Sequence, residues 1–395
     1  MQRYVRLGDQ RVATLQGSPP RELREPAAEA VLALSRFAWI RRNGEHVYAE
    51  TSLAPCAVVL HDPLVQALVA AFAVPATVEE AIARTPSLPE RTSHEVIGLL
   101  LAAGVLVDEQ GAAEEDEPPL AVWEFHDLLF HSRSRSGRNR APVGGTYRFA
   151  QRFPIAPAIP PPRETATIDL ERPDWERIER EDPPLGRVQS ERTSIRRYGG
   201  EPLARRELAE FLYRVARVED VWEAPALAPR GIPGGGTREL YLAKPYPSGG
   251  SLYELELYVV ANACRDLDRG LYHYAGDRHV LEAVAGPGPA IDKLVSDAAA
   301  GMAADPQTMQ VLIVLVARMP RIAWKYESIA YSLVLKHVGV LLHSMYLAAT
   351  AMRLGGCAVG TGDSDLFARA SGIDYYRESA VGEFALGSRP VAPDR

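Results

Sequence analysis

Two arginines with a hydroxyl group between them are the first candidates for chemistry in this sequence. Arg192 and Arg196 lie four residues apart, with Ser194 between them, at a predicted helix start. Two guanidinium forks and a hydroxyl group are suited to holding a phosphate dianion. Arg389, which follows a predicted strand near the C-terminus, is a further cation of this kind. Taken alone, the arginine pattern also fits a solvated loop.

Two segments of small residues would allow the backbone to approach a flat ring. The first is the loop Pro247-Ser248-Gly249-Gly250, which leads into a predicted strand. The second is LGGCAVGTG, residues 354–362, which we expect to form a loop after a long helix. Glycine has no side chain to hold a ligand away from the backbone. Amide groups of the second segment are therefore candidates to face a ring nitrogen.

Other catalytic motifs are missing from the sequence. It contains no GxGxxG after a strand, no Walker A lysine motif, no GxSxG and no HExxH. His337 and His343 lie six residues apart, so they face different directions on one helix. We therefore expect no metal site, and acyl transfer has little support.

Composition and charge narrow the class of protein. The chain has 395 residues, of which 47% are hydrophobic, and its net charge of -7 does not favour a nucleic-acid-binding face. Cys56, Cys264 and Cys357 form no CxxC pair, which fits a reducing cytosol. The start lacks a signal peptide, and the apolar stretch 328–354 carries charged residues such as Lys336. We predict a cytoplasmic protein with no membrane or nucleic-acid partner.

Residues 1–110 predict a winged-helix-like peptide-recognition domain. The expected elements are a helix over 27–39, a hairpin turn at 42–45, helices opened by Asp62 and Thr77, and a helix from Ser93 that Gly104 ends before a strand. The helix from Ser93 is not basic, so strand addition by a peptide is favoured over DNA binding. A purely structural domain is the alternative.

Residues 111–189 predict an extended linker with one docked helix. The proline-rich run at 152–162 is expected to be extended. The segment from Trp123 to Arg140 begins as an amphipathic helix and ends in basic residues. It is either an ordered wrap over the next domain or a site for an anionic or peptide ligand.

Residues 190–395 predict an α+β domain with a mixed sheet and long central helices. The expected elements are a helix over 202–218, a half-buried strand over 253–260, a hairpin turning at Gly276-Asp277, a buried strand over 311–316, a long helix within 328–354 and a closing strand before Arg389. On this interpretation Glu254 and Glu256 face solvent. Cys357 is expected to be a small packed residue.

Several segments together resemble the flavin-dependent nitroreductase fold. They are RTSIRRY, PYPSGGSLYELELYVV, KYE with the later GVLLHSMYLAATAMRLGGCAVG, and FALGSRP. More narrowly they are similar to the SagB-type (ThcOx-like) dehydrogenases, which oxidise azoline rings in ribosomally made peptides. WEFHDLLFHSRSRSGR is similar to that family as well, so the resemblance covers roughly Trp123 to the end.

The resemblance implies FMN as cofactor and assigns each candidate a role. Arg192, Ser194, Arg196 and Arg389 match the phosphate contacts, Pro247, Ser248, Gly249 and Gly250 match the loop along the isoalloxazine, Val359 and Gly360 match the turn that faces N5, and Lys325 with Tyr326 match the catalytic pair. The family's dimers form through the long helices, with the FMN sites at the subunit interface.

The chemistry of azoline oxidation agrees with such a pair. An azoline becomes an azole by losing a proton from the carbon beside the peptide carbonyl and a hydride from the neighbouring carbon. Tyr326 is a poor base at neutral pH unless a cation such as Lys325 favours its phenolate. Adjacent residues on a helix do not face each other, so the pair needs a loop or a helix start, which Pro320 allows. The simpler interpretation is a surface lysine beside a core tyrosine.

We therefore predict a homodimeric FMN enzyme that oxidises thiazolines or oxazolines of a precursor peptide to azoles. Its partners would be that precursor and the cyclodehydratase that makes the azolines. One alternative is an NAD(P)H-dependent nitro or quinone reductase. Another is a catalytically silent peptide-binding scaffold, which would be colourless and unable to take up FMN.

Overall fold

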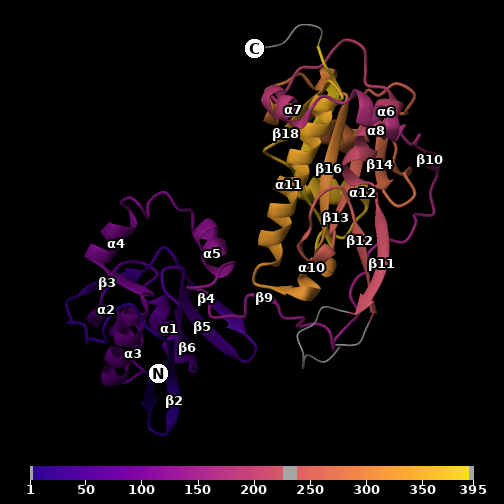
Figure 1. Cartoon of the computed structure of the whole chain (residues 1–395). Coiled ribbons are helices and arrows are strands. Elements are labelled where there is room, and N and C mark those ends of the chain that lie inside the picture. Colours follow the sequence, from indigo (N-terminus) through magenta and orange to yellow (C-terminus); the bar gives the residue numbers. More distant parts are fainter. Residues whose placement is uncertain (1–2, 226–237, 391–395) are drawn as a thin grey trace. The chain divides into compact units, whose positions relative to one another are not determined.

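The computed structural model describes residues 3–225 and 238–390 of the chain. They form two compact units, Met1–Gly144 and Gly145–Arg395, and Figure 1 shows the elements of each. The three-part division after residues 110 and 189 stays a prediction. The helix expected within the linker is α5 (Phe125–Arg133), and it belongs to the first unit.

A five-stranded antiparallel sheet forms much of the first unit. Its order is β1 (Arg3–Leu7), β2 (Gln10–Gly17), β6 (Cys56–Leu60), β5 (His46–Thr51) and β4 (Ala38–Asn43). The predicted hairpin turn joins β4 to β5. Asn43 pairs with His46, and Gly44 has a φ of 62°, the left-handed conformation that this turn requires.

Helices and a three-stranded sheet complete the first unit. They are α1 (Pro63–Ala70), α2 (Val78–Ala83), α3 (Glu90–Ala103), α4 (Glu109–Glu115) and α5, with strands in the order β7 (Ala76–Thr77), β3 (Val31–Leu34) and β8 (Leu106–Asp108). As predicted, Asp62 caps α1, Thr77 forms the capping box of α2, and Gly104 ends α3. The start of α3 lies three residues before the predicted Ser93.

The helix predicted over residues 27–39 is wrong, because this segment forms strands β3 and β4. Leu32 of β3 pairs with Ala76 on one side and with Asp108 on the other. Pairing on both edges outweighs the helical propensity of an alanine-rich run. The winged helix stays a prediction: α2, α3 and β8 follow the expected order, but the β4–β5 hairpin belongs to the other sheet.

A seven-stranded sheet is the centre of the second unit (Figure 1). Its order is β10 (Thr167–Asp169), β15 (Val280–Ala285), β14 (Gly270–Ala275), β13 (Leu255–Ala261), β16 (Val311–Arg318), β19 (Glu378–Ser388) and β18 (Leu354–Val359). Neighbouring strands in this sheet are antiparallel, whereas the sequence suggested a mixed sheet. The hairpin β14–β15 turns at Gly276-Asp277 as predicted, and such tight connections require opposite strand directions.

Helices cover both faces of this sheet. On one face α8 (Arg205–Ala216) and α11 (Ala330–Ala351) share a core that includes Phe211, Leu341 and Phe384. On the other face α9 (Pro289–Gly301) and α12 (Ser364–Ser371) pack around Leu294 and Phe367. The remaining elements are β9 (Gly144–Gly145), α6 (Trp175–Glu181), α7 (Leu185–Glu191), β11 (Asp220–Pro225), β12 (Arg238–Ala243), η1 (Gly249–Ser251), η2 (Pro306–Thr308), α10 (Met319–Lys325) and β17 (Tyr326–Glu327).

The strand predicted to be half-buried is buried on both faces. Glu254, just before β13, is 0% exposed and Glu256 is 7% exposed, so the prediction that they face solvent is wrong. Glu254 is paired with His337 of α11, and Glu256 with His273 and Arg318. A carboxylate can be buried when such partners compensate for lost hydration.

Two further expectations are corrected in the second unit. Residues 354–359 are strand β18, paired with β19, and only the residues after Val359 form a loop. The RTSIR run follows a helix rather than starting one, because α7 ends at Glu191 and Arg192 is its C-cap. The helix dipole is negative there, so an anion at this place would depend on side chains and not on helix amides.

The long helix α11 is a core helix of the second unit. By length and composition it is long enough and apolar enough to cross a membrane. It packs against β18, β19 and α8, with Val334, Leu341 and Met345 buried. The predicted helix within 328–354 is thus confirmed, and its buried face explains its apolar character.

Candidate functional site

Lys325 and Tyr326 lie at the end of α10, where the backbone changes direction. Lys325 is the last helical residue, and Tyr326 is extended, with φ of -102° and ψ of 134°. This change lets two adjacent side chains reach one point, which they could not do within a helix. A Cβ placed on Gly250 would lie 2.5 Å from Lys325 Nζ and 2.9 Å from Tyr326 Oη. The pair therefore converges on the glycine loop, at a helix end rather than at the expected helix start.

The environment of the pair is partly buried and rich in aromatic rings. Lys325 Nζ lies 5.6 Å from the ring centroids of Tyr147 and Tyr326. Burial lowers the pKa of Lys325, and the Glu239 charge opposes that effect. Burial raises the pKa of Tyr326, and the Glu254 charge adds to it. These directions are opposite to the expectation that Lys325 favours the Tyr326 phenolate: the Lys325 ammonium loses its proton more readily, and the Tyr326 phenol stays protonated.

Two buried hydrogen bonds, here called the relay, connect the glycine loop to His337 and then to Glu254. The backbone N–H of Gly249 donates to Nε2 of His337 at 2.8 Å, and Nδ1 of His337 contacts Glu254 Oε1 at 2.7 Å. Because Nε2 accepts a hydrogen bond, His337 carries its proton on Nδ1 and donates it to Glu254. Gly250 has a φ of 64°, a left-handed conformation suited to glycine. The loop is thereby fixed with its small residues toward the Lys325/Tyr326 pair.

The segment that contains Ser194 is attached to α11 and β18. Ser194 Oγ lies 2.9 Å from Tyr346 Oη, and Tyr346 Oη accepts a hydrogen bond from Ala358 N–H at 2.8 Å. Tyr346 can then donate to Ser194, which leaves the Ser194 hydroxyl hydrogen available for another acceptor. The Arg192 guanidinium lies 5.3 Å from the Tyr346 ring centroid. Arg192 and Ser194 thus lie on one side of α11.

Arg389 lies near this group, whereas Arg196 is not tied to it. The hydrogen bond from Arg187 lowers the pKa of Glu191, and the charges of Arg389 and Arg353 lower it further. Both arginines are therefore close to the end of α7, next to Arg192. Arg353 is a cation that the sequence analysis did not select. Arg196 is exposed, and no interaction among the described residues joins it to the others.

The turn after β18 is accessible at Gly360 and lies against the carboxylate of Glu383 at Gly362. A Cβ on Gly360 would meet nothing within 4 Å, so a ligand can approach this backbone. Val359 pairs with Glu383 of β19, and the Glu383 carboxylate lies against Gly362. Burial raises the pKa of Glu383 to about 7. A titratable group therefore lies beneath the turn.

The two groups of candidates fit an elongated ligand with an anionic end. Gly249 contacts His337, and Ser194 contacts Tyr346 nine residues further along α11, which is about 14 Å at 1.5 Å per residue. Arginines and a hydroxyl group stand at one end, and glycine backbone and aromatic rings at the other. This donor set matches FMN, which carries a phosphate and a flat ring system at opposite ends.

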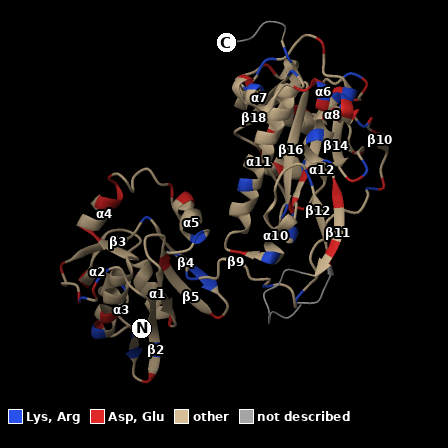
Figure 2. Cartoon of the chain, viewed as in Figure 1, with Lys and Arg blue, Asp and Glu red and all other residues tan. Residues whose placement is uncertain are grey.

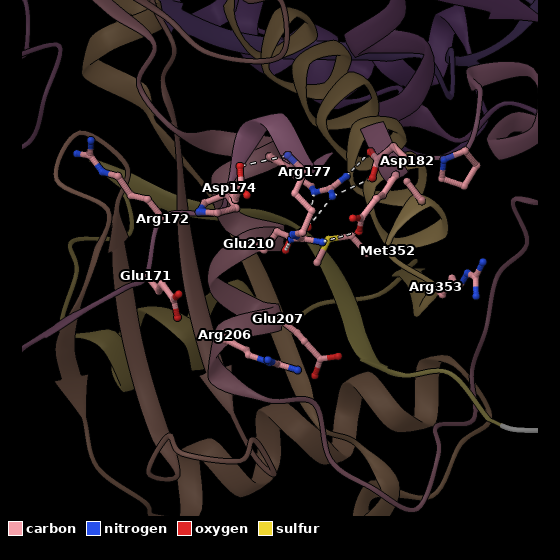
Figure 3. A pocket seen from close by; sticks show the side chains of 15 residues that line it. Glu171, Arg172, Asp174, Arg177, Asp182, Arg206, Glu207, Glu210, Met352 and Arg353 are labelled. Atoms are coloured by element: carbon pink, nitrogen blue, oxygen red, sulfur yellow. Dashed lines mark hydrogen bonds and ion pairs between the residues drawn. The ribbon is translucent and has the colours of Figure 1, made fainter. Parts of the chain in front are cut away.

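One hollow of the second unit adjoins the arginine end of the site through Arg353. It has a volume of about 750 Å³ and lies between α6, α8 and the end of α11 (Figure 3). Arg214 pairs with Asp182 and Glu210, and Arg177 pairs with Glu210. Figure 2 shows acidic and basic residues close together along α6 and α8. Two cations of the hollow, Arg177 and Arg214, are thus paired with carboxylates. Arg353 also lines the hollow, which includes no residue that the sequence analysis selected.

Sequence reasoning missed residues that lie far from the motifs along the chain. Tyr147, Glu239, His337 and Tyr346 surround or support the predicted residues. His337 and Tyr346 had one signal, since both are polar groups within an apolar helix. Tyr147 and Glu239 carried none, because only the tertiary structure brings them to α10.

Comparisons with known proteins identify the family. The nitroreductase family model matches residues 190–388, and the model for the cyanobactin oxidase ThcOx matches residues 32–140. A protein of Methanocaldococcus jannaschii named as a nitroreductase is 28% identical over 198 residues, which are 49% of this chain and 84% of that protein.

Solved structures also align with the chain. A nitroreductase structure from Anabaena variabilis has a TM-score of 0.43 and 18% identity, over 65% of this chain and 45% of that one. This chain thus spans less than half the length of that structure. The E. coli microcin synthetase McbBCD complex with truncated pro-MccB17 bound has a TM-score of 0.41 and 18% identity, over 67% of this chain and 91% of that chain.

The chain belongs to the nitroreductase family of oxidoreductases, and its second unit is the nitroreductase-like domain. The ThcOx match lies in the first unit. The predicted resemblance to ThcOx-like members of the superfamily is thereby confirmed.

Proposed function

We propose that the protein is an FMN-dependent azoline dehydrogenase. It would oxidise thiazoline or oxazoline rings of a ribosomally made precursor peptide to thiazoles or oxazoles. The observation that carries this proposal is the convergence of Lys325 Nζ and Tyr326 Oη on Gly250, in a chain that matches both the nitroreductase and the ThcOx models.

The residues that would hold FMN follow from the two groups described above. Its phosphate would lie at Arg192, Ser194 and Arg389, with Arg353 as a further cation. Its ring system would lie along Pro247, Ser248, Gly249 and Gly250, with Val359 and Gly360 toward N5. Arg196 would contribute only if its exposed side chain turns inward. Bound FMN would supply the two-electron oxidant, which dioxygen or another acceptor would regenerate.

Lys325 and Tyr326 would carry out the proton transfer of the reaction. The Lys325 amine would accept the proton from the carbon beside the peptide carbonyl as that C–H bond breaks, and the hydride of the neighbouring ring carbon would be the pair of electrons that bound FMN is suited to take up. Burial lowers the pKa of Lys325, so its amine is the better base of the two. Tyr326, whose pKa is raised, would donate a hydrogen bond to the substrate carbonyl.

The substrate chemistry also implies partners. Azolines arise when Cys, Ser or Thr side chains of a peptide cyclise with loss of water, so a cyclodehydratase must act first. The first unit would bind the precursor peptide. A reducing cytoplasm suits free cysteine substrates and the three unpaired cysteines of this chain.

A homodimer is part of the proposal. Tyr331, Leu335 and Val340 of α11 are exposed although the opposite face of the helix is packed in the core. Lys336 and His343 are exposed on this helix as well, and exposed apolar side chains with polar neighbours are typical of an interface. A second copy of the chain on this face would enclose the open side of the FMN site.

The test is a visible spectrum followed by anaerobic addition of a thiazoline-containing peptide. We expect a flavin spectrum that bleaches while the peptide loses the mass of two hydrogens per ring. In Tyr326→Phe the flavin should stay bound while turnover falls about 100-fold or more, whereas the exposed Tyr376→Phe should behave like the wild type. Bleaching by NADPH alone would support a nitro or quinone reductase instead. Protein that takes up no flavin would leave the catalytically silent peptide-binding scaffold as the remaining interpretation.

A further inference from the structure

Glu239 is a buried carboxylate to which the proposed reaction assigns no role. It lies in β12 and is 4% exposed, and its Oε2 accepts a hydrogen bond from Tyr241 Oη at 3.0 Å. Its Oε1 has no hydrogen-bond partner among the described residues. A buried carboxylate oxygen without a partner is costly, which points to a cation or a ligand close by.

The arginine next to Glu239 is already engaged with backbone. Arg321 is 1% exposed and donates to three carbonyl oxygens, one of which is Leu240 O at 3.0 Å. Leu240 follows Glu239 in β12, so this bond fixes α10 against that strand. Lys325 lies four residues after Arg321 and therefore on the same side of α10.

Lys325 is the complementary group. It is 6% exposed, and its ammonium makes no hydrogen bond to another residue in the described parts of the chain. The other titratable groups around it are Arg321, a cation, and the phenols of Tyr147 and Tyr326. Burial raises the pKa of both phenols, so they carry no negative charge at neutral pH. Glu239 is the anion that acts on Lys325.

We propose that Glu239 is the positioning residue of Lys325, and that its carboxylate supplies the counter-charge that holds the ammonium at Gly250 beside Tyr326. Its role in turnover rests on the proposed function: when the Lys325 amine accepts the ring proton, Glu239 stabilises the ammonium that forms. The pairing itself is independent of substrate and of FMN.

The first measurement is the titration of Lys325 by NMR with lysine labelled with ¹³C at Cε. The chain has four lysines, Lys244, Lys293, Lys325 and Lys336, so a Lys325→Arg variant assigns the signal. We expect Glu239→Gln to lower the titration midpoint of Lys325 by about one pH unit, and Glu239→Asp to restore part of it. Glu223→Gln, which removes an exposed carboxylate from the adjacent strand β11, should leave the midpoint unchanged. An unchanged midpoint in folded Glu239→Gln overturns the proposal.

A second measurement decides the matter if Glu239→Gln does not fold. In Lys325→Met the Glu239 carboxylate loses its cation, so it should take up a proton more readily. The wild type should unfold with a larger free energy than Lys325→Met. This difference should become smaller as the pH falls from about 8 to about 5. A deficit that stays constant with pH overturns the pairing.

Activity separates this inference from the proposed function. If the protein oxidises azolines, Glu239→Gln should lower kcat and shift the pH profile of kcat, with little change in KM. If the protein does not oxidise azolines but the Lys325 midpoint moves as expected, the pairing stands and the proposed reaction fails.

Discussion

At the scale of single residues, the site depends on burial more than on residue type. Glu254 and Glu383 carry the same carboxyl group, but Glu254 contacts His337, whereas Glu383 is half-buried without an ion pair or hydrogen bond among the described residues. Hydrogen bonding keeps the first carboxylate satisfied in the core. Desolvation makes the second a group that titrates near neutral pH.

The Glu383 carboxyl predicts a pH-dependent stability. Burial raises its folded-state pKa to about 7, above the unfolded value, so the native state binds the extra proton. The protonated Glu383 carboxyl contributes its full stabilisation at pH values below the pKa of the unfolded state. This contribution is lost as the pH rises through the pKa of the folded state. Between about pH 5 and about pH 8 the wild type should lose about 2 to 3 kcal/mol of unfolding free energy relative to Glu383→Gln.

Urea unfolding at several pH values measures this difference. Asp365→Asn is the control, because Asp365 is an exposed carboxylate of the nearby α12. Its difference from the wild type should not vary over this range. Parallel stability curves for wild type and Glu383→Gln would contradict the raised pKa.

At the scale of elements, α11 holds both ends of the site. Its first half contacts Gly249 through His337, and its second half contacts Ser194 through Tyr346. A rigid helix thereby fixes the separation of the glycine loop from the arginine group. The relation between these two segments cannot be changed without bending or moving α11.

The relay from Gly249 to Glu254 predicts that His337 supports flavin binding. His337→Leu removes both hydrogen bonds, so the FMN dissociation constant should rise about 10-fold. His337→Gln should restore part of the affinity, because an amide can accept from Gly249 and donate to Glu254. Fluorescence titration with FMN measures both.

His126→Leu is the control, since His126 is exposed and belongs to the first unit. It should bind FMN as the wild type does. Equal affinities for wild type and His337→Leu would show that the loop keeps its position without the relay.

At the scale of the whole molecule, each unit has its own core. The core of the first unit includes Phe72, Leu100 and Leu106, and the second unit has cores on both faces of its sheet. The ThcOx match covers only the first unit, and the nitroreductase match only the second. Under the proposed function, the first unit would bind the peptide and the second would carry out the oxidation.

The exposed face of α11 predicts a dimer that a single charge should break. Leu335 is 41% exposed on the outward side of α11, so Leu335→Glu would place a carboxylate in the proposed interface. Light scattering should give about twice the chain mass of 43.2 kDa for the wild type and the single-chain mass for the variant. The variant should also lose flavin.

Val122→Glu is the control for this experiment. Val122 is apolar and 77% exposed, but it belongs to the first unit. It should stay dimeric and yellow. A wild-type chain that is monomeric and still holds FMN would exclude the interface.

The sequence by itself determined the local features of the protein. Asp62, Thr77, Gly44 and Gly104 act within a few residues of their position, so their caps and turns follow from neighbouring atoms. The family resemblance and the candidate Lys325/Tyr326 pair also came from contiguous motifs. The prediction of a helix over 27–39 was wrong because β7 and β8, which lie far along the chain, pair with that segment.

Only the tertiary structure decided which polar groups are buried and what they meet. Alternation suggested that Glu254 faces water, but Glu254 precedes β13 and is buried against His337 of α11. Glu239 reaches the Lys325 side of α10 because Arg321 binds the β12 backbone. Such contacts join residues about 80 positions apart. Their strength depends on the exclusion of water, which no local pattern of residues specifies.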